Sequence, residues 1–529
     1  EIGVRLVGSE MCIRDRYLAG GNSDFLTDGF LYNNLGAGAY PKPTVKSSAS
    51  KNEMASFFGR VNYTFKDRYL LTATLRADGA SNFAKNHRWG YFPSVAAGWR
   101  FTEEEFMQPL TKVLSNGKLR LSFGQTGNSN IGNKAISYYK TGTNNEFGGI
   151  EYVGVYLDQM GNPDLKWETT TEWNVGLDLG FFNNRLNVTA EYFHKVVSDL
   201  LSERTLLSYN EVEKIAANIG RTQSQGFELT VNTKNFETKD FSWTTDLTFS
   251  LYRDKWKTRD ASWKPAAYSQ YDAPLRYFYG YLSDGIIQPG ETVEHMAGSV
   301  PGQVKIKDID GYLYAADGSI RVDENGIPMK TGEPDGRLDD ADKVIYGSKD
   351  PGYLLGFNNT FRYKNFDFNI YFYGQFARWN IGSYRDLWLT GADGMTGIVN
   401  MYRGYNMPTS AMEVWSHDNT SATRPGYFQD KSPVAAGGAS TSSAESSSTG
   451  KIGDYYLEKS WFIRCRNITV GYTIPMKQDK KLLSNVRVYA DINNPFVLTP
   501  YKGLDLETDN SIWACLLYTS PSPRDGLLS

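Results

Sequence analysis

The sequence predicts an all-β protein, an antiparallel transmembrane β-barrel, and three observations support this prediction. First, many segments alternate large apolar residues with polar ones, and a period of two indicates β-strands. Second, Phe, Tyr and Trp make up 14% of the chain, an excess that suits the aromatic girdles of a barrel at the two membrane interfaces. Third, short turns alternate with long loops, as periplasmic turns and extracellular loops do in outer-membrane barrels.

The alternation defines the strands one by one. In Phe241–Tyr252 one face carries Phe241, Trp243, Leu247, Phe249 and Leu251, and the other carries Ser242, Thr244, Asp246, Thr248 and Ser250. Strands of about ten residues with one apolar and one polar face fit a barrel, because lipid contacts one face and a wet lumen the other. The other expected strands are Ser56–Phe65, Tyr69–Asp78, Trp89–Phe101, Leu119–Gly124, Trp173–Phe181, Leu186–His194, Gly226–Thr233, Tyr353–Tyr363, Phe366–Phe376 and Val486–Asn493.

The connections between these strands fall into two length classes. Short polar turns are expected at Lys66–Arg68, Asn183–Arg185 and Lys364–Asn365, and around Asn235. The longer connections are the loop after Asp78, the helix-compatible Thr102–Leu114, a loop through Asn128, Asn133 and Asn144, and the loops Pro301–Gly347 and Trp379–Lys459. Loops as long as the last two are usually functional or disordered.

The composition of the chain argues against nucleic-acid binding and against membrane-spanning helices. The chain has 56 Lys and Arg residues against 59 Asp and Glu residues, so no basic field for a nucleic-acid partner follows from its charge. No apolar run approaches the roughly 18 residues of a membrane helix. A barrel still fits, because it places its apolar residues at alternate positions.

Both ends of the chain have the character of an adapter-derived artefact. Residues 7–16 (VGSEMCIRDR) and 515–525 (CLLYTSPSPRD) are encoded by one DNA segment when it is read on opposite strands in shifted frames, as expected of a transposon-type sequencing adapter. We therefore expect residues 1–16 (at least 7–16) and 515–529 to be artefact, and 17–514 to be a partial barrel. Cys465 is then the one native cysteine, so neither a disulfide nor a cysteine metal site is expected within 17–514.

Several blocks in this order resemble the SusC/RagA family of TonB-linked outer-membrane transporters. They are residues 62–71 (NYTFKDRYLL), 75–83 (LRADGASNF), 89–94 (WGYFPS), 121–128 (LSFGQTGN), 162–168 (NPDLKWE), 218–220 (NIG), 226–229 (GFEL) and 466–472 (RNITVGY). The resemblance runs from about Glu53 to about Leu506, nearly the whole native part.

The resemblance implies an importer in the outer membrane of a Gram-negative, Bacteroidota-like bacterium. It implies a plug domain, coupling to TonB, a SusD-like surface lipoprotein partner, and an oligosaccharide or peptide as ligand. We expect this chain to be an incomplete barrel with long extracellular loops. The plug, the coupling segment and the first strands are expected upstream, and a final strand downstream. The resemblance implies no covalent chemistry, so the expected activity is transport and not catalysis.

One split motif predicts a calcium site. Asp308-Ile309-Asp310-Gly311 begins a calcium-loop pattern, and Asp335–Asp342 completes it when Tyr312–Pro334 is removed as an inserted hairpin. Clustered oxygen ligands on a tight turn are what a hard cation such as Ca²⁺ prefers. The expected ligands are Asp308, Asp310, Asp335, Asp339 and Asp342 with the backbone carbonyl of Arg337. The alternative is an acidic surface loop without a metal.

Loop aromatics are candidates for stacking on sugar rings, with packing within the loops as the alternative. They are Trp256, Trp263, Tyr268, Tyr271, Trp379, Trp388 and Trp415. Two rival functions remain open at this point. A soluble all-β carbohydrate-binding protein should have shorter strands and less aromatic outward faces. A secreted glycosidase needs two converging carboxylates, which the sequence does not indicate, and no catalytic residue is expected.

Overall fold

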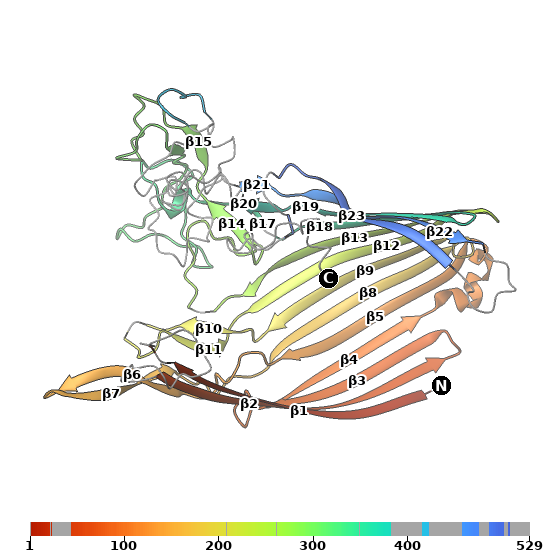
Figure 1. Cartoon of the computed structure of the whole chain (residues 1–529), viewed down its shortest axis with the longest axis horizontal. Coiled ribbons are helices and arrows are strands. Elements are labelled where there is room, and N and C mark those ends of the chain that lie inside the picture. Colours follow the sequence, from red (N-terminus) through yellow and green to blue (C-terminus); the bar gives the residue numbers. More distant parts are fainter. Residues whose placement is uncertain are drawn as a thin grey trace.

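The main body of the protein is one antiparallel sheet that curves across its width (Figure 1). The computed structural model describes residues 2–21, 23, 44–207, 209–260, 262–348, 350–381, 415–422, 457–475, 486–501 and 506–507. Within them thirteen strands are hydrogen-bonded in the order β1-β2-β3-β4-β5-β8-β9-β12-β13-β18-β19-β22-β23. Their bounds are β1 (Ile2–Gly21), β2 (Thr44–Phe65), β3 (Tyr69–Ala80), β4 (Trp89–Trp99), β5 (Leu114–Asn128), β8 (Glu168–Phe181), β9 (Leu186–Ser198), β12 (Arg221–Glu237), β13 (Phe241–Thr258), β18 (Tyr353–Tyr363), β19 (Phe366–Phe376), β22 (Phe462–Ile474) and β23 (Val486–Leu498).

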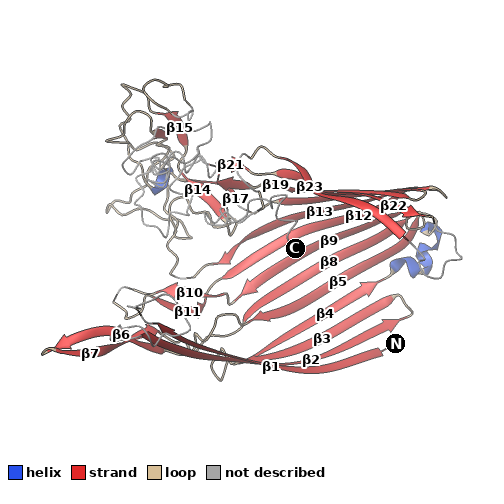
Figure 2. Ribbon diagram, viewed as in Figure 1, coloured by secondary structure: helices blue, strands red, loops and turns tan. Residues whose placement is uncertain are grey.

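The remaining elements belong to the connections (Figure 2). Within the described residues they form five two-stranded sheets, and the helices there are 3-10 turns. Their bounds are β6 (Tyr138–Phe147), β7 (Ile150–Gln159), β10 (Leu201–Thr205), β11 (Lys214–Asn218), β14 (Tyr277–Gly280), β15 (Ser283–Ile286), β16 (Val304–Ile306), β17 (Val344–Ser348), β20 (Trp379–Ile381), β21 (Leu457–Lys459), η2 (Phe101–Glu103), η3 (Glu105–Leu110) and η4 (Asp340–Asp342). In the described part of the chain, no helix has the length and apolar character needed to cross a membrane.

The strand register places the apolar residues of neighbouring strands in common rows. Phe249 on β13 lies opposite Leu229 on β12 and Leu355 on β18. Large side chains in these rows remain exposed, as Trp173 (58%) and Val488 (61%) show on β8 and β23. A continuous exposed apolar face requires an apolar neighbour, and hydrocarbon provides one. The predicted all-β, antiparallel barrel wall is therefore confirmed.

Eleven of the thirteen described strands of the large sheet were predicted, several of them shorter than observed, whereas β1 and β22 were not predicted. β18 and β19 have the expected bounds, whereas β12 and β13 extend beyond the segments predicted for them. The loop expected after Gly124 contains a hairpin, β6–β7, that the alternation pattern missed. Its first strand, β6, is rich in Thr and Asn, but the turn of the hairpin carries a recognisable signal. Gly148 and Gly149 both have positive φ (63° and 78°), as a two-residue hairpin turn favours.

The short turns gather at one end of the sheet and the long loops at the other (Figure 1). The turns predicted at 66–68, 183–185 and 364–365 are present, and each places residues other than glycine in the left-handed region. Examples are Asp67 at φ 54° and Asn184 at φ 58°. At the opposite end lie the connections β5–β8, β9–β12 and β13–β18. The predicted loop Trp379–Lys459 lies largely outside the described residues.

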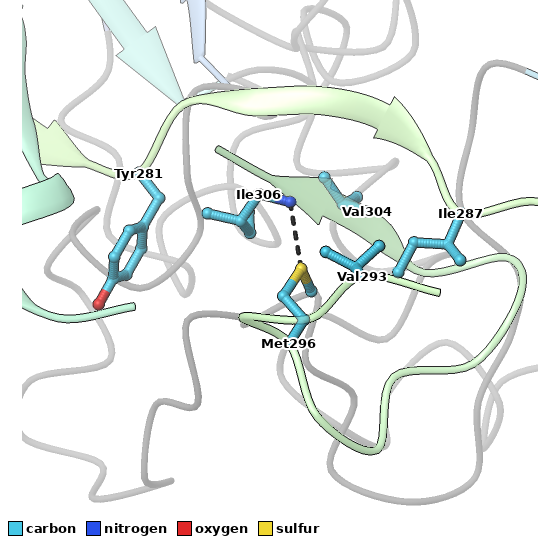
Figure 3. Close-up of a cluster of buried hydrophobic side chains, with 6 residues drawn as sticks. All are labelled: Tyr281, Ile287, Val293, Met296, Val304 and Ile306. Atoms are coloured by element: carbon cyan, nitrogen blue, oxygen red, sulfur yellow. Dashed lines mark hydrogen bonds between the residues drawn. The ribbon is translucent and has the colours of Figure 1, made fainter. Parts of the chain in front are cut away.

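The β13–β18 connection has a hydrophobic core of its own. Six buried side chains converge from β16 and from the segments beside β15 and β16 (Figure 3): Tyr281, Ile287, Val293, Met296, Val304 and Ile306. The Ile306 amide also donates a hydrogen bond to the Met296 sulfur at 3.3 Å. The part of this connection around residues 281–306 is therefore stabilised by its own packing in addition to its attachment to the sheet.

β1 and β23 are the edges of the large sheet, and the described residues contain no pairing between them. β1 contains residues 7–16, and it pairs with β2 from Ile2↔Tyr63 to Gly21↔Thr44. Pairing with a free sheet edge requires only backbone groups. The adapter origin of residues 1–16 and 515–529 is therefore untested by this pairing and remains a prediction.

Candidate functional site

The acidic loop of the β13–β18 connection brings together the two halves of the split motif. The Asp308 carboxylate accepts hydrogen bonds from the amides of Asp335 (3.3 Å) and Gly336 (2.7 Å). Gly336 has φ 83°, a conformation that glycine adopts without the steric cost paid by other residues. The predicted closure of the motif around residues 308 and 335 is therefore present.

The segment between the two halves consists of two reversals, where the sequence analysis expected one hairpin. Isolated bridges join Tyr314 to Ile320 and Val322 to Pro328, so the chain turns at Gly318 and again at Gly326. A third bridge, Tyr312↔Lys330, returns the chain to its starting point. The insertion thus closes on itself and leaves the flanking acidic segments side by side.

The loop carboxylates are held by backbone amides. Asp342 is fully buried and accepts from Ile309 (2.8 Å), Asp310 (3.2 Å) and Asp339 (2.9 Å). Burial raises the pKa of Asp342 above its usual range, and these amides oppose that shift. Burial likewise raises the pKa of Asp339, whose carboxylate accepts from the Ala341 amide at 2.7 Å.

The other expected ligands make similar local bonds. Asp310 Oδ1 accepts from the Gly332 amide (2.7 Å), and Asp335 Oδ1 accepts from the Arg337 amide (2.9 Å). Among the described residues, no three His, Cys, Asp or Glu side chains are arranged to hold a metal ion. Calcium binding by Asp308, Asp310, Asp335, Arg337, Asp339 and Asp342 therefore remains a prediction.

Lys330 is a loop residue that the sequence analysis missed. Its half-buried ammonium donates hydrogen bonds to the backbone carbonyls of Ala341 and Lys343. Burial lowers its pKa, while Asp310, Asp339, Asp340 and Asp342 act to raise it. A protein cation is thus already near the carboxylates, so their mutual repulsion is reduced without a metal. No spacing rule indicated this residue, because the double reversal brings it there.

A second candidate surface is the polar face of the large sheet. It contains a hollow of about 560 Å³ bounded by β2–β5, β8 and β9. The hollow is lined partly by charged and amide side chains, among them Asn62, Lys118, Arg120, Glu172, Asn174 and Glu191. Arg120 pairs with Asp178 on β8 (Nε–Oδ2, 2.8 Å) and with Glu191 on β9 (3.4 Å). These pairs join three strands on the face opposite the exposed apolar rows.

A ladder of amides continues this polar face across the next strands. Asn232 on β12 donates to Asp246 on β13 (2.8 Å), and Asn358 on β18 donates to the same carboxylate (3.2 Å). Asn369 on β19 then donates to Asn358 at 2.8 Å. The hydrogen-bonding groups of this face therefore satisfy one another across strands and also offer polar contacts to whatever occupies the lumen.

The loop aromatics lie in different environments. Tyr268 stacks on Tyr279 at 4.2 Å, Trp415 is buried beside His417, and Trp379 on β20 lies under the Lys459 ammonium. Trp388 lies outside the described residues. Trp256 and Trp263 enclose the guanidinium of Arg259, and Tyr271 is 40% exposed. Only some of the predicted aromatics are thus free to meet a ligand.

Comparison with known proteins agrees with this geometry. Residues 8–297 match the family described as TonB dependent receptor-like, beta-barrel. The TonB-dependent receptor SusC of Bacteroides thetaiotaomicron is 31% identical over 493 residues, which are 90% of this chain and 43% of that protein. The TonB-dependent receptor P3 of Formosa agariphila is 29% identical over 507 residues, which are 92% of this chain and 45% of that receptor.

A solved structure shares the fold. The RagAB peptide transporter superposes with a TM-score of 0.71 at 21% identity, covering 96% of this chain and 51% of that one. The chain spans about half the length of the relatives that it matches.

Proposed function

Because this chain belongs to the TonB-dependent receptor-like β-barrel family, we propose that it forms barrel wall and ligand-contacting loops of a SusC-type nutrient importer. The predicted resemblance to the SusC/RagA family is confirmed, and the protein is located in the outer membrane. In this proposal the complete protein takes up an oligosaccharide or a peptide. It works with a SusD-like surface lipoprotein and is coupled to TonB.

The observation that carries the proposal is the division of the sheet into two chemically different faces. One face presents exposed apolar rows such as Trp173 and Val488, and the other presents the charged network around Arg120. Such a sheet is stable only between hydrocarbon and a polar lumen. We assign the short turns to the periplasm and the long loops to the cell surface, following the usual asymmetry of outer-membrane barrels.

The proposed chemistry is binding and passage without bond cleavage, so the protein is not an enzyme in this proposal. The lumenal carboxylates Asp178 and Glu191 both pair with the Arg120 guanidinium, which suits a structural network and not a free acid/base pair. Hydrolysis of a glycan by the purified protein would contradict this part of the proposal.

Growth of cells tests the transport function directly. The gene is deleted from a host that carries it, and the strain is grown on a panel of single oligosaccharides and peptides as carbon source. Loss of growth on one class, restored by the full-length gene, is the expected result. Normal growth on every substrate, or purification of the protein in aqueous buffer without detergent, would refute the proposal.

Labelling in intact cells tests the sidedness. Cysteines introduced at Glu324 in the β13–β18 loop and at Asn184 in the β8–β9 turn are both exposed positions. An impermeant thiol reagent should modify the first and not the second. The reverse pattern would invert the assigned topology.

A further inference from the structure

Arg259 is a cation held between two aromatic rings at the end of β13. It follows Thr258, the last residue of that strand. Its guanidinium lies 5.3 Å from the ring centroid of Trp256 and 4.0 Å from that of Trp263. Planar guanidinium groups stack favourably on indole faces, so the two rings fix the position of the charge.

Among the described residues, this half-buried guanidinium has no anionic partner. Within the described residues it makes no hydrogen bond or ion pair, and its Nε is enclosed without any partner. Burial lowers the pKa of Arg259, and the titratable groups that influence it are Tyr271 and Tyr277, with no carboxylate among them. A partly desolvated charge ordinarily costs free energy unless it is paired.

The neighbouring carboxylate is already engaged elsewhere. Asp260 accepts from both Nε (3.2 Å) and Nη2 (2.6 Å) of Arg204. It also accepts from the amide and the hydroxyl of Ser262. These contacts, chiefly that of Arg204, lower the pKa of Asp260 to about 2. Asp260 is therefore engaged by Arg204 and does not pair with Arg259.

An exposed ring lies close to this charge. The Tyr271 side chain is 40% exposed. The Tyr271 hydroxyl donates to the backbone carbonyl of Lys257 at 3.0 Å, which anchors the ring beside the end of β13. A cation with free donors and an exposed aromatic ring therefore stand together on the loop side of the sheet.

We propose that Arg259, with Tyr271 beside it, binds the carboxylate of a uronic acid residue in the imported oligosaccharide. This inference rests on the proposed transport function and specifies its substrate class. A carboxylate matches the guanidinium fork with two parallel hydrogen bonds. In a uronic acid the carboxylate is attached directly to the pyranose ring, so one sugar residue supplies both the anion and a C–H face for the aromatic ring. A peptide carboxylate offers the charge without the attached ring.

Binding of defined trisaccharides to the full-length, detergent-solubilised protein tests the site. Titration calorimetry compares trigalacturonate with the neutral trisaccharide maltotriose, for wild type, Arg259→Gln and Lys264→Gln. Lys264 is an exposed cation of the same loop and serves as the matched control. Because hydrogen bonds to charged groups are the stronger ones, Arg259→Gln should lose trigalacturonate affinity roughly tenfold or more. Lys264→Gln should change it less than about twofold, since exposed charges contribute little.

A conservative variant separates the site from a folding defect. Arg259→Lys keeps the charge but loses the bidentate fork, so it should weaken trigalacturonate binding several-fold and leave the barrel assembled, as judged by heat-modifiable gel migration. Equal trigalacturonate affinities for wild type and Arg259→Gln, or equal losses in Arg259→Gln and Lys264→Gln, would overturn the proposal.

Two further results would distinguish this inference from the proposed function. If triglutamate binds in an Arg259-dependent manner and trigalacturonate does not, the sugar assignment is wrong while transport stands. If the deletion strain shows no growth defect on any oligosaccharide or peptide, the transport function itself fails.

Discussion

Arginine at two consecutive positions of β4 should destabilise the protein to different extents, because the two side chains face different media. Val95 belongs to the exposed apolar face (45% exposed), whereas Ala96 lines the lumenal hollow. β4 begins at Trp89 and ends at Trp99, which at about 3.3 Å per residue is a length of roughly 33 Å. A tilt of about 40° reduces this to roughly 25 Å along the membrane normal, the height of the apolar band of a barrel.

Val95 therefore lies close to the centre of the membrane. It is four residues from Trp99, or about 10 Å along the membrane normal. A charged residue facing lipid at this depth costs about 2–4 kcal/mol, so Val95→Arg should destabilise the folded protein by that amount. Ala96→Arg should cost less than about 1 kcal/mol, because its charge enters a polar hollow that also contains Glu172 and Glu191.

Reversible unfolding of the full-length protein in lipid vesicles, followed by urea titration and heat-modifiable gel migration, measures both costs. The measurement compares the midpoints of wild type and the two variants at matched slope. If Ala96→Arg destabilises the protein as much as Val95→Arg, the assignment of the two faces is wrong.

Three further predictions concern the β13–β18 connection. Ile287→Ala removes a side chain that is 1% exposed and should destabilise the loop unit by about 2–5 kcal/mol. Limited proteolysis should cleave the loop faster, while the gel migration of the folded barrel stays unchanged. Ile320→Ala, at an exposed position of the same connection, should have no effect. The Asp260 pKa is lowered to about 2, so its ion pair stabilises the loop above about pH 4 and is lost as the pH falls towards 2. The protection factors of amides near residue 260, which compare the observed exchange rate with the intrinsic rate at each pH, should fall over that interval and stay constant between pH 5 and 7. If the acidic loop binds Ca²⁺, calorimetry of the full-length protein should give a Kd of roughly 10⁻⁴–10⁻³ M, and Asp335→Ala with Asp339→Ala should abolish the heat; identical heats would leave only a metal-free acidic loop.

The barrel wall was predictable because the environment of each strand residue depends mainly on its face. A lipid-facing position requires an apolar side chain, and a lumenal position tolerates a polar one. Because successive strand residues face opposite sides, the sequence alternates between the two types with a period of two. β18 and β19 were predicted with their observed bounds for this reason. β13 was predicted six residues too short, since beyond Tyr252 it continues as Arg253–Thr258, where charged residues replace the apolar ones.

The loop site was predictable only in part, because its contacts come from distant segments. The motif spacing correctly predicted that Asp308 and Gly336 lie next to each other. It did not indicate that the ammonium of Lys330 would approach the same carboxylates, since that depends on two reversals between residues 312 and 330. The Arg259 cluster was missed for a similar reason. Trp256 and Trp263 were recognised as candidates. That Arg259 has no acidic partner among the described residues depends on the pairing of the adjacent Asp260 with Arg204, which the sequence did not indicate.

The exceptions to the alternation also follow a physical rule. Thr245 and Asn359 are polar residues in the lipid-facing rows of β13 and β18, and the register places them directly opposite one another. The Asn359 carbonyl oxygen accepts from the Thr245 hydroxyl (2.7 Å) and from the Trp243 indole (2.9 Å), and its side chain is nearly enclosed. An unsatisfied polar group in hydrocarbon costs several kcal/mol, so a single exception would be unstable and a matched pair is tolerated. A polar residue can therefore occupy the lipid-facing surface when a neighbouring strand satisfies its hydrogen bonds. The alternation of apolar and polar residues considers one residue at a time, so it detects apolar character but not such a matched pair.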